Sequence, residues 1–406
     1  MSRPKLVLVG NGMAGARALE ELLKLAPDLY EISVFGAEPH PNYNRILLSP
    51  VLAGEMTLNE IVLNDLDWYA TNRVKLHLGK CVAHIDRVTR RAIAEDGTSE
   101  AYDRLILATG SNPVMLPVPG KDLPGVLTYR DIADTDGMIE AAKCHKHAVV
   151  VGGGLLGLEA ANGLRARGME VTVVHLMPWL MERQLDRVAA SMLQQSLEAK
   201  GLKFLLEKKT AELVAGESGR VAAVRFSDGE TIPAELVVMA VGIRPNTALA
   251  GSAGLHVNRG IVVNDTMQTY DPRIYAVGEC VAHRGTAYGL VAPLFEMAKV
   301  CANHLARAGF GRYGGTLLST RLKVTGIEVF SAGEFAGSAG CEDIVYADPA
   351  ERVYRKLVLR DGCLAGAVLV GDATDAAWYQ ELIESRRDIG ALRERLIFGR
   401  ALAAGV

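Results

Sequence analysis

The stretch LVLVGNGMAGARALEEL, residues 6–22, carries the pattern that decides the fold of this chain. The apolar run 6–9 predicts a buried parallel strand, and residues 16–25 have the apolar spacing of a helix. Gly10, Gly12 and Gly15 stand between them with the spacing GxGxxG. The first glycine permits a tight turn, the second lets the backbone approach a pyrophosphate, and the third lets helix and strand pack closely. We therefore expect a dinucleotide site, with the phosphates at the N-terminus of the helix.

The stretch AVVVGGGLLGLEAANGL, residues 148–164, repeats this pattern with Gly152, Gly154 and Gly157. We expect a strand at 148–151, a helix at 158–167 and a further strand at 171–174. Each copy is followed by a similar closing strand, in YDRLILATGSNP (102–113) and in AELVVMAVGIRPN (234–246). Two complete repeats predict that one chain holds two dinucleotides at once.

The stretch TYDPRIYAVGECVAHR, residues 269–284, indicates how the two repeats are connected. It predicts a short buried strand at 274–277, and residues 293–306 have the spacing of a helix. We expect this segment to return to the first repeat, so that the second is inserted within it. The predicted class is α/β, with two Rossmann-like domains followed by a small α+β tail. The predicted domains are 1–118 with 245–310, then 119–244, then 311–406.

An acidic side chain after the second strand of such a domain accepts hydrogen bonds from an adenosine ribose. Glu38 follows the predicted strand 32–35 and suits this role, although it could also be a solvated loop carboxylate. In the second repeat His175 follows the strand instead. No arginine comes directly after that strand, which favours NADH over NADPH, but Arg183 leaves NADPH open.

Composition narrows the classes of function. The 406 residues include 44 Lys and Arg against 47 Asp and Glu, so a net charge of −3 gives no general attraction to nucleic acid or anionic lipid. No signal peptide and no apolar run long enough to span a membrane are visible, so we expect a cytoplasmic protein. The six cysteines are scattered singly and the histidines lack ligand spacing, so no metal site is predicted.

These features together resemble the flavin-dependent pyridine nucleotide reductases, whose fold is glutathione-reductase-like. EPHPNYNRILLSPVLAGE (38–55) and STRLKVTGIEVFSAGEF (319–335) are more specifically similar to the flavoprotein portion of assimilatory NAD(P)H nitrite reductases and to electron-transfer subunits of assimilatory nitrate reductase. The resemblance covers nearly the whole chain. It implies FAD in the first domain and NADH or NADPH in the second.

The resemblance also implies site residues. The ATG stretch and the later glycine-acid stretch of the family both contact the flavin, and Glu279 stands where the family usually has aspartate. Arg45 matches an arginine that lies against the flavin nucleotide, although from its charge alone it could be exposed. The implied contacts with the flavin are Gly10, Gly12, Met13, Ala14, Gly15, Glu38, Arg45, Val82, Thr109, Gly110, Arg130, Gly278 and Glu279. The implied contacts with the nicotinamide dinucleotide are Gly152, Gly154, Leu155, Leu156, Gly157, His175 and Gly242.

Glu159 is the candidate catalytic residue. In related reductases a glutamate here reaches toward the nicotinamide and the flavin, and it is often paired with a lysine in the segment RxxLSK. This chain reads RILLSP, so Pro50 replaces the lysine. We expect Glu159 to find another partner, to meet solvent, or to have a raised pKa because of burial. A solvated carboxylate on a helix face is the simpler alternative.

The family comparison also bears on the acceptor of the electrons. Thiol-dependent members carry a reactive cysteine shortly after the first strand pair, and residues 16–80 contain none. Longer relatives carry iron-sulfur and siroheme modules, whereas this chain reaches Val406 without a cysteine cluster, so we expect an external acceptor. The tail is expected to be an interface domain with strands at 320–324, 328–332 and 353–359, and helices from 375 onward. A cluster of arginines there could form a docking patch or simply a solvated helix: Arg386, Arg387, Arg393 and Arg395.

A bound flavin can take two electrons from a nicotinamide and release them singly, so we expect an NAD(P)H reductase. The leading hypothesis is that it serves an iron-sulfur carrier or a nitrite or nitrate reductase component, and a homodimer is among the assemblies that the resemblance allows. One alternative is a ferredoxin or rubredoxin reductase of another pathway. Another is a redox-sensing flavoprotein.

Overall fold

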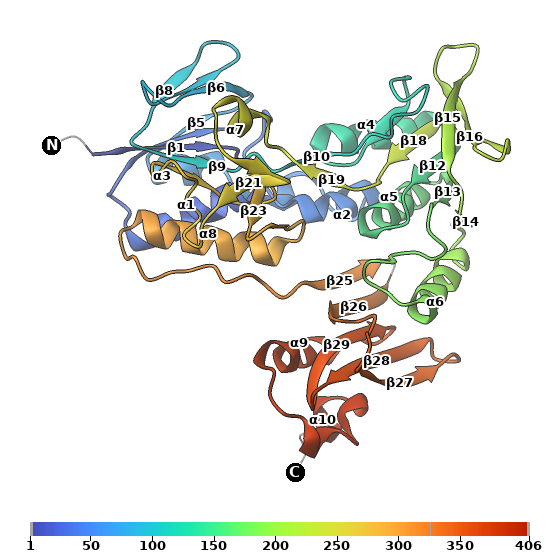
Figure 1. Cartoon of the computed structure of the whole chain (residues 1–406). Helices are drawn as coiled ribbons and strands as arrows, with labels where there is room; N and C mark the ends of the chain where they lie inside the picture. Colours follow the sequence, from blue (N-terminus) through green and yellow to red (C-terminus); the bar gives the residue numbers. More distant parts are fainter. Residues whose placement is uncertain (1–2, 325, 404–406) are drawn as a thin grey trace. The chain divides into compact units, whose positions relative to one another are not determined.

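The computed structural model describes residues 3–324 and 326–403, which fall into two compact units (Figure 1). The first unit comprises residues 1–48, 56–112 and 243–316. The second comprises residues 49–55, 113–242 and 317–406. The chain thus passes into the second unit and back, and the short segment 49–55 belongs to the second unit although its sequence neighbours belong to the first.

A five-stranded parallel sheet forms the centre of the first unit, in the order β22-β9-β1-β2-β5. Its strands are β1 (Lys5–Val9), β2 (Glu31–Phe35), β5 (Val74–His77), β9 (Arg104–Leu107) and β22 (Ile274–Ala276). Helices α1 (Met13–Leu25) and α8 (Val291–Leu305) pack together on one face of the sheet (Figure 1). The strand 274–277 therefore joins the sheet of the first repeat, as the sequence predicts.

Smaller elements complete the first unit. An antiparallel sheet contains β6 (Val82–Asp86), β7 (Arg91–Ala94) and β8 (Ser99–Ala101), and β3 (Asn42–Tyr43) pairs with β4 (Val62–Asn64). A four-stranded sheet contains β20 (Val257–Asn258), β21 (Gly260–Val263), β23 (Val281–His283) and β24 (Thr286–Ala287). The short helices of this unit are α3 (Leu66–Thr71) and α7 (Ala248–Ser252), and β10 (Ser111–Pro113) pairs with β19 (Ile243–Pro245). Helix α2 (Leu48–Ala53) lies, apart from Leu48, in the segment that belongs to the second unit.

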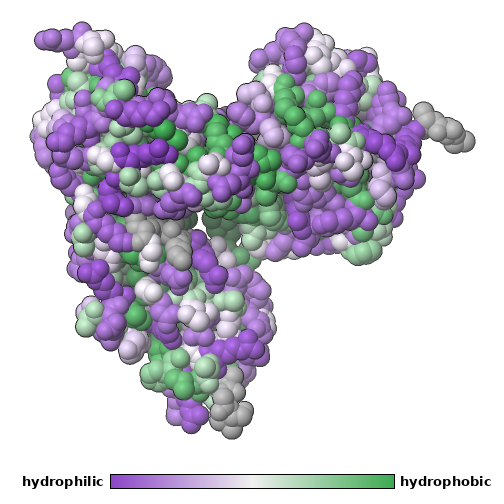
Figure 2. Space-filling model, turned by 180° about the vertical axis from the view of Figure 1, so that it is seen from behind, coloured by the Kyte–Doolittle hydropathy of each residue, from purple (hydrophilic) through white to green (hydrophobic). Residues whose placement is uncertain are grey.

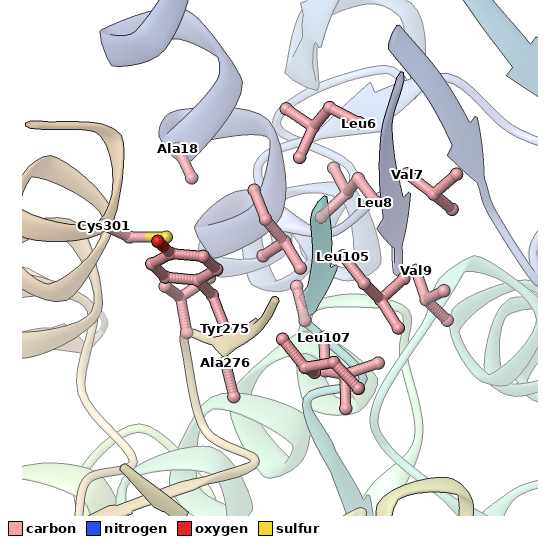
Figure 3. Close-up of a cluster of buried hydrophobic side chains, with 14 of the residues drawn as sticks. Leu6, Val7, Leu8, Val9, Ala18, Leu105, Leu107, Tyr275, Ala276 and Cys301 are labelled. Atoms are coloured by element: carbon pink, nitrogen blue, oxygen red, sulfur yellow. The ribbon is translucent and has the colours of Figure 1, made fainter. Parts of the chain in front are cut away.

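The core of the first unit forms where its parallel strands meet α1 and α8. Figure 3 shows Leu6 and Leu8 of β1 beside Leu105 of β9, while Tyr275 lies next to Cys301 of α8. Both faces of the central strands are buried, which explains why their sequences are continuous apolar runs rather than alternating ones.

The second unit has its own five-stranded parallel sheet, in the order β11-β18-β12-β13-β14. Its strands are β11 (Val126–Thr128), β12 (His147–Val151), β13 (Glu170–Val174), β14 (Lys203–Leu205) and β18 (Leu236–Met239). The helices are α4 (Ile132–Cys144), α5 (Leu155–Ala166) and α6 (Arg187–Glu198). An antiparallel sheet of β15 (Thr210–Ala215), β16 (Val221–Phe226) and β17 (Thr231–Pro233) covers part of the core. The α/β class and the repeat of the strand-turn-helix pattern are thus confirmed.

The tail forms an antiparallel sheet in the order β25-β26-β29-β28-β27. Its strands are β25 (Ser319–Val324), β26 (Ile327–Gly333), β27 (Glu342–Asp348), β28 (Val353–Arg360) and β29 (Cys363–Val370), and α9 (Ala376–Ser385) packs on it. Strand β27 was not predicted from the sequence. The helices expected from residue 375 onward reduce to α9, two 3₁₀ turns and α10 (Arg400–Ala403).

The four tail arginines do not share one helix. Arg386 follows α9 in a left-handed conformation (φ 48°), and Arg393 pairs with Glu342 of β27. Arg387 and Arg395 are exposed in the segment that follows α9. The solvated-helix interpretation is therefore wrong for these residues, because the chain leaves the helix at Ser385.

Among the described residues, no helix is both long and apolar enough to cross a bilayer. Hydrophilic residues cover most of the face drawn in Figure 2.

Candidate functional site

The first glycine turn has the close contacts that the sequence pattern requires. Gly10 has a φ of +107°, and a Cβ there would lie 2.1 Å from the carbonyl oxygen of Ala108. A Cβ on Gly15 would lie 2.5 Å from the carbonyl oxygen of Gly10. These two positions therefore accept only glycine, because any side chain would collide with backbone.

The second glycine turn reproduces this geometry. Gly152 has a φ of +125°, and its Cβ would lie 2.2 Å from the carbonyl oxygen of Ala240. A Cβ on Gly157 would lie 2.0 Å from the carbonyl oxygen of Gly152. The two turns are thus built alike, each at the carboxyl end of the middle strand of its own sheet.

Both turns are open where a pyrophosphate would approach. Gly12 and Gly154 are the N-caps of α1 and α5, and neither supplies a side-chain cap. A Cβ at either position would meet no atom within 4 Å. The first N–H groups of both helices are therefore available to an anion, which fits a dinucleotide in each turn. Met13 and Ala14 begin α1, and Leu155 and Leu156 begin α5.

A cluster around Glu38 lies after β2. The hydroxyl of Tyr43 donates to Oε2 of Glu38 over 2.7 Å, and Arg45 forms an ion pair with Oε1. The Arg45 guanidinium also lies 5.5 Å from the centre of the Tyr43 ring. Glu38 and Arg45, which the sequence analysis assigned separately to the ribose and the flavin nucleotide, are therefore direct neighbours.

The ATG stretch and the glycine-acid stretch come together in the first unit. The Thr109 hydroxyl donates to the carbonyl oxygen of Asn246 over 2.7 Å, and the Asn246 amide donates to the carbonyl oxygen of Gly110. The Ser111 hydroxyl donates to Glu279 over 2.7 Å. Gly278 has a φ of +92°, and a Cβ there would lie 2.9 Å from that of Ala14. These stretches thus converge on the first turn of α1.

Three other predicted residues lie outside the two glycine turns in the sequence. Val82 begins β6 and is buried in the core of the first unit. Arg130 belongs to the second unit, where its backbone N–H donates to Asp134 just before α4. Gly242 has a φ of +116°, and its carbonyl oxygen accepts from the Val114 amide. Their contacts with a cofactor stay predictions.

Glu159 has a partner that the sequence analysis missed. The hydroxyl of Ser49 donates to Oε2 of Glu159 over 2.7 Å. The hydroxyl of Tyr129 in turn donates to the Ser49 oxygen over 3.1 Å. Burial raises the pKa of Glu159 above its ordinary value, and the hydrogen bond from Ser49 partly opposes that shift. Burial likewise raises the pKa of Tyr129. Ser49 directly precedes Pro50, which stands where related reductases often have the lysine. The hydrogen bond to the Glu159 carboxyl group therefore comes from the neighbouring serine hydroxyl.

His175 is turned toward the second glycine turn. Its Nδ1 accepts from the Gly153 amide over 3.0 Å, and its Nε2 lies 3.1 Å from Oε2 of Glu182. His175 is only 8% exposed. Glu182 was missed because it lies eight residues beyond the end of β13, where no local pattern marks it.

The cysteines show no redox pair. All six are free, and Cys280 and Cys301 are buried with pKa values that burial raises. Within the described residues, no group of three or more His, Cys, Asp or Glu side chains is placed to hold a metal ion.

Comparisons with known proteins show the family to which the chain belongs. Residues 4–302 match the family model of the pyridine nucleotide-disulphide oxidoreductases, and residues 319–387 match the rubredoxin NAD+ reductase C-terminal domain. A nitrite reductase [NAD(P)H] of Bacillus subtilis is 54% identical over 389 residues, which are 96% of this chain and 48% of the relative. The assimilatory nitrate reductase electron transfer subunit of the same organism is 47% identical over 98% of this chain and 51% of the relative. The chain therefore spans about half the length of these curated relatives.

A solved structure shows a similar fold. The ferredoxin reductase of the CYP199A2 system from Rhodopseudomonas palustris superimposes with a TM-score of 0.85 and 28% identity, covering 93% of each chain. The family model and these relatives identify the class of protein as a nicotinamide-dependent flavoprotein reductase. The chain belongs to the pyridine nucleotide-disulphide oxidoreductase family, as an oxidoreductase whose cofactors are FAD and NAD(P)H.

Proposed function

We propose that this chain is the NAD(P)H-oxidising flavoprotein component of an assimilatory nitrite or nitrate reductase system. In this proposal FAD binds at the first turn and NADH or NADPH at the second. When bound, FAD accepts an electron pair from NAD(P)H and can return the electrons one at a time. The acceptor is an iron-sulfur carrier or a siroheme or molybdenum component.

One observation carries the proposal. The contacts of Gly10 and Gly152 agree to within about a tenth of an ångström, which supports the proposal of two similar dinucleotide sites in one chain. A dehydrogenase that passes hydride directly to a small substrate needs only one such site, and the second repeat would then have no use. The similarity to the two Bacillus subtilis proteins supports nitrite or nitrate assimilation as the process.

The residues of the chain would then bind and orient the cofactors rather than supply nucleophiles. In this proposal the N-termini of α1 and α5 bind the two pyrophosphates, and Glu38 accepts hydrogen bonds from the adenosine ribose of the flavin nucleotide. Ser49 and Tyr129 orient the carboxyl group of Glu159, which is the proposed catalytic residue and whose pKa is raised by burial. Positioning of this kind can supply most of the rate acceleration for hydride transfer.

The test uses the purified full chain loaded with FAD. We expect NADH or NADPH to bleach the flavin absorbance under anaerobic conditions, and a reduced iron-sulfur carrier to appear when candidate carriers are mixed in by stopped flow. Coupling to a nitrite or nitrate reductase component, whether a separate protein or a further module, should give ammonium or nitrite with NAD(P)H consumption. A chain that cannot bind FAD, or whose flavin neither nucleotide reduces, would contradict the proposal.

A second candidate is a ferredoxin or rubredoxin reductase of another pathway. The solved ferredoxin reductase and the C-terminal match to rubredoxin NAD+ reductases favour it. Faster reduction of rubredoxin or of an oxygenase ferredoxin than of the nitrite or nitrate component would decide for this candidate. A homodimer and a cytoplasmic location stay predictions, to be tested by light scattering and by cell fractionation.

A further inference from the structure

The two glycine turns can be aligned by their hydrogen bonds, which gives each residue of the second a counterpart in the first. The Gly10 amide donates to the carbonyl oxygen of Phe35 over 2.8 Å, and the Gly152 amide donates to that of Val174 over the same distance. The residues that follow these carbonyls, Gly36 and His175, are therefore equivalent.

At this pair of facing positions, the glycine and the larger residue are interchanged between the two units. In the first unit a Cβ on Gly36 would lie 3.1 Å from the Cβ of Asn11. In the second unit the glycine is Gly153, and a Cβ there would lie 2.8 Å from Cγ of His175. The imidazole thus fills the space beside the second turn that the Asn11 side chain fills beside the first.

The loop after the second strand returns to the same backbone carbonyl in both units. The side-chain amide of Asn42 donates to the carbonyl oxygen of Asn11 over 2.9 Å. The backbone amide of Met181 donates to the carbonyl oxygen of Gly153 over 3.0 Å. The residue that corresponds to Glu38 in the order of the chain is the apolar Met177. Glu182, which directly follows Met181, brings a carboxylate back to the rim of this turn.

A fixed chain of hydrogen bonds holds that carboxylate. Because Nδ1 of His175 accepts from the Gly153 amide, the ring proton resides on Nε2, which donates to Oε2 of Glu182. The Glu182 side chain is 22% exposed, so the carboxylate remains accessible from solvent. The Arg183 side chain is 86% exposed, and its Nε lies 3.9 Å from Oε1 of Glu182.

We propose that Glu182, oriented by His175, makes the second dinucleotide site select NADH over NADPH. This inference rests on the proposed function, in which the second turn binds the nicotinamide dinucleotide. A carboxylate there accepts hydrogen bonds from the ribose hydroxyls of NADH and repels the 2′-phosphate of NADPH. Glu182 is the specificity residue and His175 the positioning residue.

The experiment measures binding of two adenosine fragments, ADP and 2′,5′-ADP, to the full FAD-loaded chain by calorimetry. We expect the wild type to bind ADP about tenfold or more tightly than 2′,5′-ADP, because like charges close together are costly. E182Q, which keeps the shape but removes the charge, should bring the two affinities within about threefold of each other. H175Q should reduce the preference partly, since it releases the carboxylate without removing it.

Two control variants test the assignment to Glu182. E198Q removes a carboxylate from α6 of the same unit, where Glu198 accepts from Gln194, and should leave the preference unchanged. R183A should also leave it unchanged. Rates of flavin reduction by NADH and NADPH should follow the same order as the fragment affinities.

The inference is overturned if the wild type binds 2′,5′-ADP as tightly as ADP, if E182Q retains the full preference, or if R183A alone abolishes discrimination. If E182Q binds neither fragment and also has a lowered midpoint of thermal unfolding, the substitution has damaged the fold. E182D, which keeps the carboxylate, is then the test, and it should retain the preference for ADP. If neither fragment binds and neither nucleotide reduces the flavin, the proposed function itself fails. Binding of both fragments without discrimination defeats only this inference.

Discussion

Gly10 and Gly12 show how much a single Cβ atom matters at the residue scale. A Cβ on Gly10 would strike the Ala108 carbonyl in a backbone conformation that side chains rarely adopt, whereas a Cβ on Gly12 would stand in open space. The first glycine is therefore required by the fold, and the second is required only if a ligand lies against the turn.

We expect G10A to destabilise the apoprotein by about 1 to 3 kcal/mol and to abolish FAD binding, because backbone must shift. G12A is the matched control. It should leave the thermal unfolding midpoint of the apoprotein nearly unchanged but weaken FAD binding, since its methyl group occupies the side open to the pyrophosphate. Differential scanning calorimetry and FAD titration measure the two effects, and FAD binding by G12A at wild-type affinity would contradict a flavin at this turn.

Glu159 illustrates how burial couples one residue to pH. The folded state raises the pKa of this carboxyl group above its ordinary value of 4.5. Between 4.5 and the folded value the native state holds the proton more tightly than the unfolded state, so this residue's contribution to stability falls as pH rises through that range. E159Q should remove this dependence. Its unfolding midpoint relative to wild type should therefore be higher at pH 8 than at pH 4, as thermal unfolding at both values would show.

Ser49 should tune the same titration. Its hydrogen bond lowers the pKa of Glu159, so S49A should extend the pH-dependent loss of stability to higher pH. S49T keeps the hydroxyl and should behave like the wild type. Identical pH profiles for S49A and the wild type would mean that the hydrogen bond does not act on Glu159.

At the scale of elements, α2 is attached to the second unit by α5. Arg167, which follows α5, donates from Nε to the carbonyl oxygen of Leu52 over 2.7 Å and from Nη2 to that of Val51 over 3.0 Å. The Leu52 side chain is fully buried, and a Cβ on Gly163 would lie 2.6 Å from its Cγ. This attachment places Ser49 beside Glu159.

R167A should leave two carbonyl groups without a charged donor and cost about 1.5 to 3 kcal/mol of unfolding free energy. The larger expected effect is local. Without the hydrogen bonds from Arg167, segment 49–55 is held less firmly, and the Ser49 hydroxyl is no longer fixed in position. Hydrogen exchange of residues 49–55, followed by mass spectrometry, should become faster in R167A. R165A, which removes a neighbouring arginine of α5 that donates to Asn162, is the control and should leave that exchange unchanged.

At the scale of the whole molecule, the chain belongs to a family named for disulphide chemistry but carries six free thiols. Cys81 and Cys144 are exposed, whereas Cys280 and Cys301 are buried. Iodoacetamide should therefore modify the first two in the native protein and spare the buried pair. Flavin reduction by NAD(P)H should keep its rate after alkylation, in an assay of the modified protein whose sites are mapped by mass spectrometry. A loss of rate that parallels alkylation of any one cysteine would assign that thiol a role.

The features that the sequence could predict are those written into contiguous residues. The glycine spacing and the apolar runs around residues 6–25 and 148–167 depend on local backbone geometry and on burial of both faces of a strand, so their elements were predicted to within a few residues. The return of strand 274–277 to the first sheet was also predictable, because its sequence repeats the apolar run and glycine of the earlier closing strand. The end of α9 could not be predicted from the sequence. The helix ends where the backbone of Arg386 adopts a left-handed conformation, and no glycine or proline marks that position.

The sequence by itself determined the class of fold, the two dinucleotide turns and the absence of a clustered thiol pair. Only the tertiary structure decided which side chains meet at those turns: Ser49 with Glu159, and Glu182 with His175. The physical reason is that a glycine turn is specified by sterics between near neighbours, whereas each of these carboxylates depends on where a separate loop or helix docks. The Ser49 hydroxyl on α2 and the His175 imidazole after β13 contact these carboxylates only because the chain packs in this way. The spacing of residues along the sequence does not predict such contacts.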